Sequence, residues 1–146
     1  MALDAYGLGR VVGAKGVLPQ RAAKLDPSLP LRDGEMLIDV ESLNIDAASF
    51  KQLKDAAGGD SAKVVAAIQA IVLERGKMQN PVTGSGGMLI GRVRGISPSH
   101  PAVNSVKPGD RIATLVSLTL TPLVIEEVRG VKPEIDRVDV RGHAIL

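Results

Sequence analysis

The sequence predicts a mainly β fold, a small β-barrel with a two-helix insert at about residues 47–76. Short segments rich in Val, Ile and Leu alternate with turns that draw on 16 glycines and 9 prolines, as in antiparallel sheets with short strands. One region between two strand segments has apolar residues at helical spacing instead. With 146 residues and 45% hydrophobic content, the chain fits one domain with a modest core.

The most regular strand pattern lies at residues 35–43, after an Asp33-Gly34 turn signal. Alternation predicts a buried face and an opposite face on this strand. We assign Met36, Ile38 and Val40 to the buried face, and Leu37, Asp39, Glu41 and Leu43 to the other. Upstream, residues 10–15 contain β-branched side chains and could form a first strand. Prolines and turn residues make the segment between them a loop.

The helical insert begins after an Asn44-Ile45-Asp46 turn, where Asp46 is a plausible N-cap. Gly58-Gly59 ends the first helix, and Asp60 or Ser61 caps a second that runs from Ala62 to about Arg75. Gly76 is a good C-cap. The second helix carries an apolar stripe, which we expect to pack against the domain or a partner: Val64, Val65, Ile68, Ile71 and Val72.

A glycine-rich loop at residues 80–87 leads into a second long strand at residues 88–96. Gly91 and Gly95 within that strand indicate bulges or close backbone contacts. Residues 97–105 should form a loop, and residues 106–116 a turn plus a strand. Short strands at residues 124–128 and 138–146 complete the barrel.

Composition excludes several classes of function. Aromatic residues make up 1% and the net charge is +2, so we expect no nucleic-acid surface. Cysteine is absent, which excludes disulfides and thiolate chemistry and suits a cytoplasmic location. No apolar run reaches the roughly 20 residues that span a bilayer, and we expect neither membrane association nor a signal peptide.

Three segments resemble the medium-chain dehydrogenase/reductase superfamily. They are Asp33-Gly-Glu-Met-Leu-Ile-Asp-Val40, Gly91-Arg-Val93 and Val106-Lys-Pro-Gly-Asp-Arg-Ile-Ala113. In that superfamily such segments belong to the catalytic domain. The resemblance therefore implies a GroES-like, partly open β-barrel.

A closer resemblance is to the L-erythro-3,5-diaminohexanoate dehydrogenase family. It rests on residues 15–20, 43–50, 57–60 and 112–123, and above all on Asn80-Pro-Val-Thr-Gly-Ser-Gly-Gly-Met-Leu-Ile-Gly91. The resemblance implies a small diamino acid substrate and NAD or NADP as cofactor. The implied reaction, in lysine fermentation, is oxidative deamination of the 3-amino group to a 3-oxo acid with release of ammonia.

The resemblance also implies a Rossmann domain that binds the nicotinamide cofactor. No Gly-x-Gly-x-x-Gly turn occurs between a strand and a helix in this chain. We therefore expect residues 1–146 to be the catalytic or substrate domain of a longer protein, inactive in isolation. The expected partners are that Rossmann domain and a second copy in a homodimer.

Zinc-binding members of the superfamily place a Cys after the first long strand and a Gly-His-Glu motif before the second. The corresponding positions here fall near Asp46 and at Gly87 and Met88. A lone carboxylate is a poor zinc site, because zinc enzymes normally supply three protein ligands. We expect no metal.

The resemblance points to a substrate site built from two stretches of chain. Asp46 is the candidate for binding an ammonium group or for acting as the base, with Asn44 and Ser49 as substrate-binding neighbours. Across the pocket we expect an anion nest formed with backbone N–H groups, whose members we predict to be Asn80, Thr83, Gly84, Ser85 and Gly86.

Structural alternatives remain open for each residue at this point. Asp46 is also a plain helix N-cap, and Ser49 and Asn44 suit local capping or turn chemistry. Lys51, Lys54 and Lys77 could bind a carboxylate, although surface lysines are far commoner. His100 and His143 are expected to be structural or exposed.

Two other functions also remain open. One is a non-catalytic GroES-like binding or assembly module. The other is a zinc-independent member resembling quinone or alcohol reductases.

Overall fold

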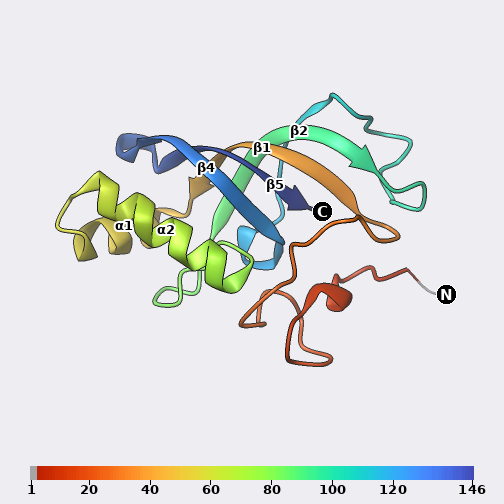
Figure 1. The fold of residues 1–146 in the computed structure, drawn as a ribbon, viewed down its shortest axis with the longest axis horizontal. Helices are drawn as coiled ribbons and strands as arrows, with labels where there is room; N and C mark the ends of the chain where they lie inside the picture. Colours follow the sequence, from red (N-terminus) through yellow and green to blue (C-terminus); the bar gives the residue numbers. More distant parts are fainter. Residues whose placement is uncertain (1–2) are drawn as a thin grey trace.

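The computed structural model describes residues 3–146 and shows a five-stranded antiparallel sheet with two helices (Figure 1). The strand order is β3-β2-β1-β5-β4, and the two edge strands do not pair, so the sheet stays open. This confirms the partly open barrel with a helical insert. The strands are β1 (Met36–Ile45), β2 (Gly87–Ile96), β3 (Arg111–Ala113), β4 (Leu123–Lys132) and β5 (Arg137–Ile145); the helices are α1 (Ala47–Ala56) and α2 (Ser61–Arg75).

β1 is the central strand, and a bulge changes which of its residues face the core. Pairing with β2 shifts between Val40 and Ser42, leaving Glu41 as the extra residue. Met36, Ile38 and Val40 are buried as predicted. Beyond the bulge the alternation is inverted, because one inserted residue exchanges the two faces. Leu43, which we predicted on the opposite face, is therefore fully buried in the core.

Gly91 allows the two long strands to approach at this bulge. A Cβ atom on Gly91 would collide with the carbonyl oxygen of Asp39 on β1. Close contact at Gly91 thus agrees with its prediction from sequence.

Both helices begin at their predicted capping residues and α2 ends at Gly76 as predicted, whereas α1 ends at Ala56, just before Gly58-Gly59. The Asp46 side chain accepts from the Ala48 N–H, and the Asp60 side chain from the N–H groups of Ala62 and Lys63. Gly76 closes α2 in the left-handed conformation with φ 64°. The stripe of α2 packs into the core of this domain through Val64, Ile68 and Val72.

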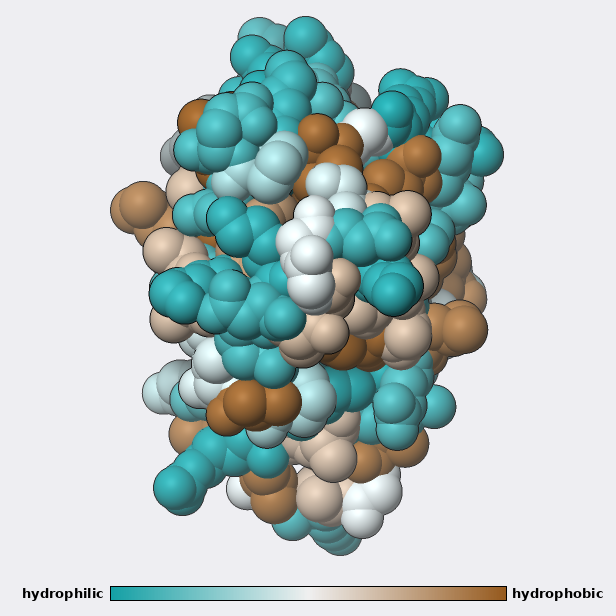
Figure 2. Space-filling model, turned by 90° about the vertical axis from the view of Figure 1, so that its left-hand side faces the viewer, coloured by the Kyte–Doolittle hydropathy of each residue, from teal (hydrophilic) through white to brown (hydrophobic). Residues whose placement is uncertain are grey.

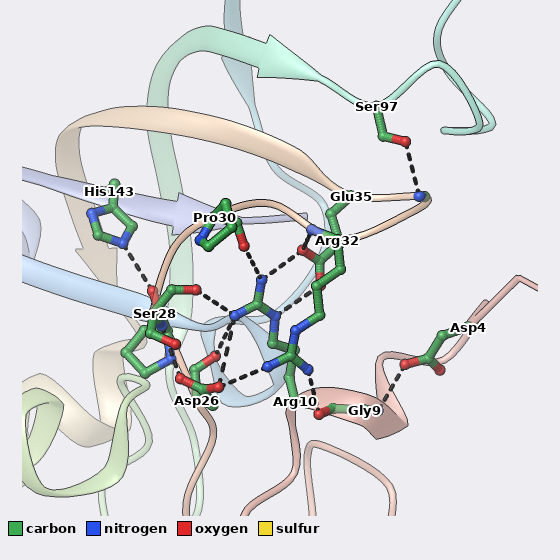
Figure 3. A network of polar contacts seen from close by, with 12 residues as sticks. Asp4, Gly9, Arg10, Asp26, Ser28, Pro30, Arg32, Glu35, Ser97 and His143 are labelled. Carbon is green, nitrogen blue, oxygen red and sulfur yellow. Dashed lines mark hydrogen bonds and ion pairs between the residues drawn. The ribbon is translucent and has the colours of Figure 1, made fainter.

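The N-terminal arm (residues 3–34) contains no strand, which corrects the prediction for residues 10–15. Its only β-type pairing is an isolated bridge between Val11 and Leu25. Arg10 is 3% exposed and its guanidinium binds the Glu35 carboxylate through two hydrogen bonds of 2.8 and 2.7 Å. This ion pair and the carbonyls around it hold the arm as a loop against the start of β1 (Figure 3).

Three other boundaries differ from the prediction. Asn44 and Ile45 extend β1 instead of forming a turn, since both pair with β2. β3 spans only three residues, because Lys107 and Asp110 close a turn just before it. β4 is longer than predicted, whereas β5 has the predicted length, and the two pair as a hairpin joined by a 3-10 turn at Pro133–Ile135.

Charged side chains cover the outer face of the sheet in pairs. Glu41 of β1 binds both Arg92 of β2 at 3.2 Å and Arg111 of β3 at 3.0 Å, and Arg94 binds Asp39. At the end of the molecule seen in Figure 2, hydrophobic residues lie in separate small groups between hydrophilic ones. Among residues 3–146, no single helix is long and apolar enough to cross a membrane; α1 and α2 meet those criteria only together, with a bend of 118° between them.

Candidate functional site

The end of β1 and the start of β2 bring together the two stretches that the sequence singled out. Ile45 pairs with Gly87, and the Asp46 N–H donates to the Gly86 carbonyl oxygen at 2.8 Å. The site loop (residues 80–86), green and below α2 in Figure 1, therefore lies against the first turn of α1. This pairing agrees with the prediction that the two stretches lie close together.

Three hydroxyl groups meet between α1 and the site loop, and we call them the hydroxyl cluster: Ser49, Thr83 and Ser85. The Ser49 hydroxyl is 2.6 Å from the hydroxyls of both Thr83 and Ser85. Ser49 is fully buried, Ser85 is half-buried and Thr83 is exposed. The cluster thus runs from the protein interior to solvent.

Asp46 joins the hydroxyl cluster while it caps α1. Its Oδ1 atom accepts from the Ala48 N–H at 3.0 Å and from the Ser85 hydroxyl at 3.2 Å. Its Oδ2 atom receives no hydrogen bond from the described part of the chain, and the side chain is exposed. Asp46 can therefore cap the helix and bind substrate at the same time, because Oδ1 accepts from the helix N–H while Oδ2 remains available.

The small residues at the end of the loop are required by close backbone packing. A Cβ on Gly86 would collide with the Met78 carbonyl oxygen, and a Cβ on Gly87 with that of Asn44. Gly87 also has φ 138°, a region that disfavours side chains. The glycines at the positions aligned with the zinc-ligand motif thus let β2 reach the end of β1.

Asn80 and Gly84 shape the site loop from within. The Asn80 Oδ1 atom accepts from the Val82 N–H at 2.9 Å, and its Nδ2 donates to Gln52 of α1 at 2.8 Å. The Gly84 N–H donates to the Asn80 carbonyl at 2.7 Å, so this N–H is already engaged. Substrate binding by these residues stays a prediction, and the described contacts give both a role in loop structure.

Asn44 lies apart from the other predicted site residues. Its Nδ2 atom reaches the Ile135 carbonyl at 3.5 Å, at the tip of the β4–β5 hairpin. Its neighbour Ile45 faces the core. Since side chains alternate along a strand, Asn44 points to the opposite side of the sheet.

The chain matches a family model described as the L-erythro-3,5-diaminohexanoate dehydrogenase N-terminal domain over residues 9–146. The chain belongs to this family. It is 57% identical over 141 residues to the L-erythro-3,5-diaminohexanoate dehydrogenase of Fusobacterium nucleatum subsp. nucleatum, and 54% identical to that of Acetoanaerobium sticklandii. Both alignments cover 97% of this chain and 41% of the relative.

Residues 3–146 do not contain the parallel strand, glycine-rich turn and helix that bind a dinucleotide in a Rossmann fold. The sheet pairings are antiparallel, and β1 leads into α1 through Asp46 without a glycine-rich turn. A dinucleotide site normally needs a parallel sheet and such a turn at a helix N-terminus. Within residues 3–146, no group of three or more His, Cys, Asp or Glu residues could hold a metal ion either.

Lys77 differs most from its sequence-based interpretation, which treated it as a surface lysine. It is fully buried, and its Nζ donates to the carbonyl oxygens of Pro19 at 2.7 Å and Thr119 at 2.8 Å. Burial, with a smaller effect from the charge of Arg75, lowers the Lys77 pKa to about 8. Met78 is the only hydrophobic residue among the near neighbours of Lys77 in the chain, so the local sequence gives little sign of burial.

The two histidines lie outside the hydroxyl cluster. The His100 Nδ1 atom accepts from the Ala102 N–H at 3.0 Å, and burial lowers the pKa of the imidazole. The His143 Nε2 atom lies 3.0 Å from the Pro27 carbonyl. Both therefore have structural partners, in line with their interpretation from sequence.

Two hollows in the described part of the domain lie away from the cluster. One, of about 460 Å³, lies between the N-terminal arm, α2 and β4, and is lined by Leu25, Val72 and Leu123 among others. The other, of about 300 Å³, lies between the helices and the β4–β5 hairpin. The hydroxyl cluster instead opens directly onto the surface beside Asp46.

Proposed function

We propose that this chain is the substrate-binding part of an NAD(P)-dependent amino-acid dehydrogenase that acts on L-erythro-3,5-diaminohexanoate. The reaction would be oxidative deamination of the 3-amino group, giving a 3-oxo acid and ammonia. The observation that carries the proposal is the contact of Asp46 with the hydroxyl cluster in a domain of this family. The substrate is taken from the two relatives, which are L-erythro-3,5-diaminohexanoate dehydrogenases.

Asp46 has the charge and exposure that an ammonium-binding group needs. The substrate carries two ammonium groups, and the one that reacts must lose a proton before hydride can leave its carbon. The open Oδ2 of Asp46 would bind that ammonium group and accept the proton. The Oδ1 atom, held by Ala48 and Ser85, would keep the carboxylate oriented.

The hydroxyl cluster complements Asp46 with groups that both donate and accept. A hydroxyl has one donor and two acceptor lone pairs, so its hydrogen bonds can reverse direction. Thr83 and Ser85 would bind the polar groups of the substrate, and the buried Ser49 would hold both hydroxyls in place.

The rest of the enzyme would complete the site. This chain spans 41% of the length of the relatives, and we propose that the remainder contains a Rossmann domain and covers the open cluster. A nicotinamide cofactor held there would supply the hydride acceptor. Closure would also exclude water and strengthen the attraction between Asp46 and the ammonium group.

The test replaces Asp46, the N-cap of α1, with Asn in the full-length protein. Asn caps helices about as well as Asp, so Asp46→Asn should change stability little. It should lower kcat/KM for 3,5-diaminohexanoate about 100-fold, through loss of the base and its charge. The assay measures ammonia release and nicotinamide reduction with NAD⁺ and with NADP⁺.

The matched control is Asp60→Asn, because Asp60 caps α2 in the same manner without contacting the cluster. We expect it to keep normal activity. Unchanged turnover in Asp46→Asn would remove Asp46 from the reaction. Absence of ammonia release by the unaltered protein would refute the proposed function itself.

A further inference from the structure

Three side chains just before the site loop bind backbone carbonyls of the N-terminal arm. Arg75, Lys77 and Gln79 are spaced two residues apart where α2 gives way to extended chain. Arg75 donates to Ala23 at 3.0 Å, Lys77 to Pro19 at 2.7 Å and Gln79 to Gln20 at 3.1 Å. The acceptors all lie at the turn around residues 18–23, which we call the arm turn.

Gln79 connects the arm turn to the site loop. Its Nε2 atom donates to the Gln20 carbonyl at 3.1 Å and to the Gly84 carbonyl at 3.0 Å. Gly84 lies between Thr83 and Ser85, the two loop residues of the hydroxyl cluster. One side-chain amide therefore links the arm turn to the loop segment that carries both hydroxyls.

The opposite side of the loop is held by α1. Asn80 binds Gln52, and both loop hydroxyls bind Ser49. The loop thus has one anchor on α1 and one on the arm turn. If the Gln79 anchor is lost, the outer part of the loop remains attached on the α1 side only.

The buried oxygen of Gln79 carries a cost to stability. Its Oε1 atom is buried and has no hydrogen-bond partner among the described residues. An unsatisfied buried polar atom costs about 1–3 kcal/mol. An apolar side chain of similar size would avoid this cost, so the amide is favoured by the two carbonyls that its nitrogen binds.

We infer that Gln79 is a positioning residue that sets the distance of Thr83 and Ser85 from Ser49 by holding Gly84 against the arm turn. The inference rests on the proposed function, because it takes the cluster as the substrate-binding site. The N-terminal arm then has a role in the site, because the arm turn holds Gln79 and through it the loop. Lys77 secures that support by binding Pro19 and Thr119 together.

The test uses Gln79→Met and Gln79→Glu in the full-length protein. Met removes both N–H donors and the buried oxygen, while Glu keeps the shape and loses the donors. In both variants we expect the amide hydrogens of residues 82–85 to exchange at least about tenfold faster, and KM for 3,5-diaminohexanoate to rise about tenfold or more. The cofactor KM should stay unchanged.

Gln20→Ala is the matched control, because it removes an exposed side chain and keeps the carbonyl that Gln79 binds. It should match the unaltered protein in exchange and in kinetics. Normal exchange and an unchanged KM in both Gln79 variants would overturn the inference. So would a loss of kcat with KM unchanged, the result expected from a lower folded fraction.

The outcomes also separate this inference from the proposed function. Suppose that the full-length protein has no activity on 3,5-diaminohexanoate but its Gln79 variants show faster loop exchange. The missing activity would then refute the proposed function. The positioning of the loop by Gln79 would still be supported by the faster exchange.

Discussion

Ser49 is the residue on which the geometry of the candidate site depends most. It is fully buried, and its oxygen lies within 3.2 Å of the Thr83 hydroxyl, the Ser85 hydroxyl and the Ser85 carbonyl. One hydroxyl has a single hydrogen to donate, so at least one neighbouring hydroxyl must donate to Ser49. The arrangement is therefore held by all three hydroxyls together.

We expect Ser49→Ala to destabilise the protein by about 1 kcal/mol, the usual net value of a lost hydrogen bond. It should also raise KM for the diamino acid, because Thr83 and Ser85 lose their common partner. Denaturant unfolding and steady-state kinetics measure the two effects. Ser61→Ala, at the start of α2 and without a side-chain hydrogen bond, should change neither; equal effects of the two substitutions would contradict this role of Ser49.

At the scale of elements, the site depends on how closely β2 starts beside the end of β1. The Ile45–Gly87 pairing and the Asp46–Gly86 hydrogen bond place the loop against α1. Backbone atoms surround Gly87 so tightly that a Cβ has no space. Glycine at this position is thus a condition for forming the site.

A comparison of two glycines tests this conclusion. Gly87→Ala should cost at least about 2 kcal/mol, because it adds a backbone collision to an unfavourable φ. Gly84→Ala has φ 73° and open space around it, so it should cost only about 1 kcal/mol. Equilibrium unfolding compares the two; an equal loss would show that backbone conformation alone accounts for the effect at Gly87.

At the scale of the whole molecule, the ion pair between the buried Arg10 and the half-buried Glu35 attaches the N-terminal arm to the sheet (Figure 3). Burial would raise the pKa of Glu35, but hydrogen bonds from Arg10 and Arg32 and their charges outweigh it and lower the pKa. A carboxyl group with a lowered pKa in the folded state stabilises that state when ionised. The arm that supports the site loop is therefore held by an acid-sensitive contact.

The stabilisation from Glu35 should be complete above its unfolded pKa of about 4.5 and should be lost as the pH falls through the lower folded value. We expect the difference in unfolding free energy between the unaltered protein and Glu35→Gln to shrink below pH 4.5. Denaturant unfolding between pH 3 and pH 7 measures it.

Glu74→Gln, at an exposed position on α2, is the control and should change the free energy of unfolding little. A constant difference for Glu35→Gln across the same range would contradict the role given to the ion pair.

Local chemistry made much of the fold predictable. Asp46 and Asp60 cap helices because their carboxylates reach the N–H groups two residues ahead. The α2 stripe and the Gly76 terminus follow from helical spacing and from the freedom of glycine. The contact of Asp46 and Ser49 with the loop was expected through a resemblance that aligned both stretches with one site.

Contacts between distant segments explain where the predictions failed. Residues 10–15 have strand-forming side chains, yet Arg10 is held by Glu35 and by carbonyls that only the folded arm provides. Asn44 was grouped with Asp46 by proximity in the chain, but strand alternation turns it to the other side. Lys77 is a surface residue by type and is buried here because Pro19 and Thr119 supply acceptors.

By itself, the sequence determined the class of fold and most helix boundaries, because caps, turns and periodicity depend on neighbouring residues. A family resemblance indicated the two stretches of the candidate site. Only the tertiary structure decided the bulge that buries Leu43, the loop structure of the arm and the attachment of Gln79 to the arm turn. Each depends on a partner more distant in the chain or on the pairing register of two strands. Such contacts form only when the whole domain folds, so they cannot be predicted from local sequence patterns.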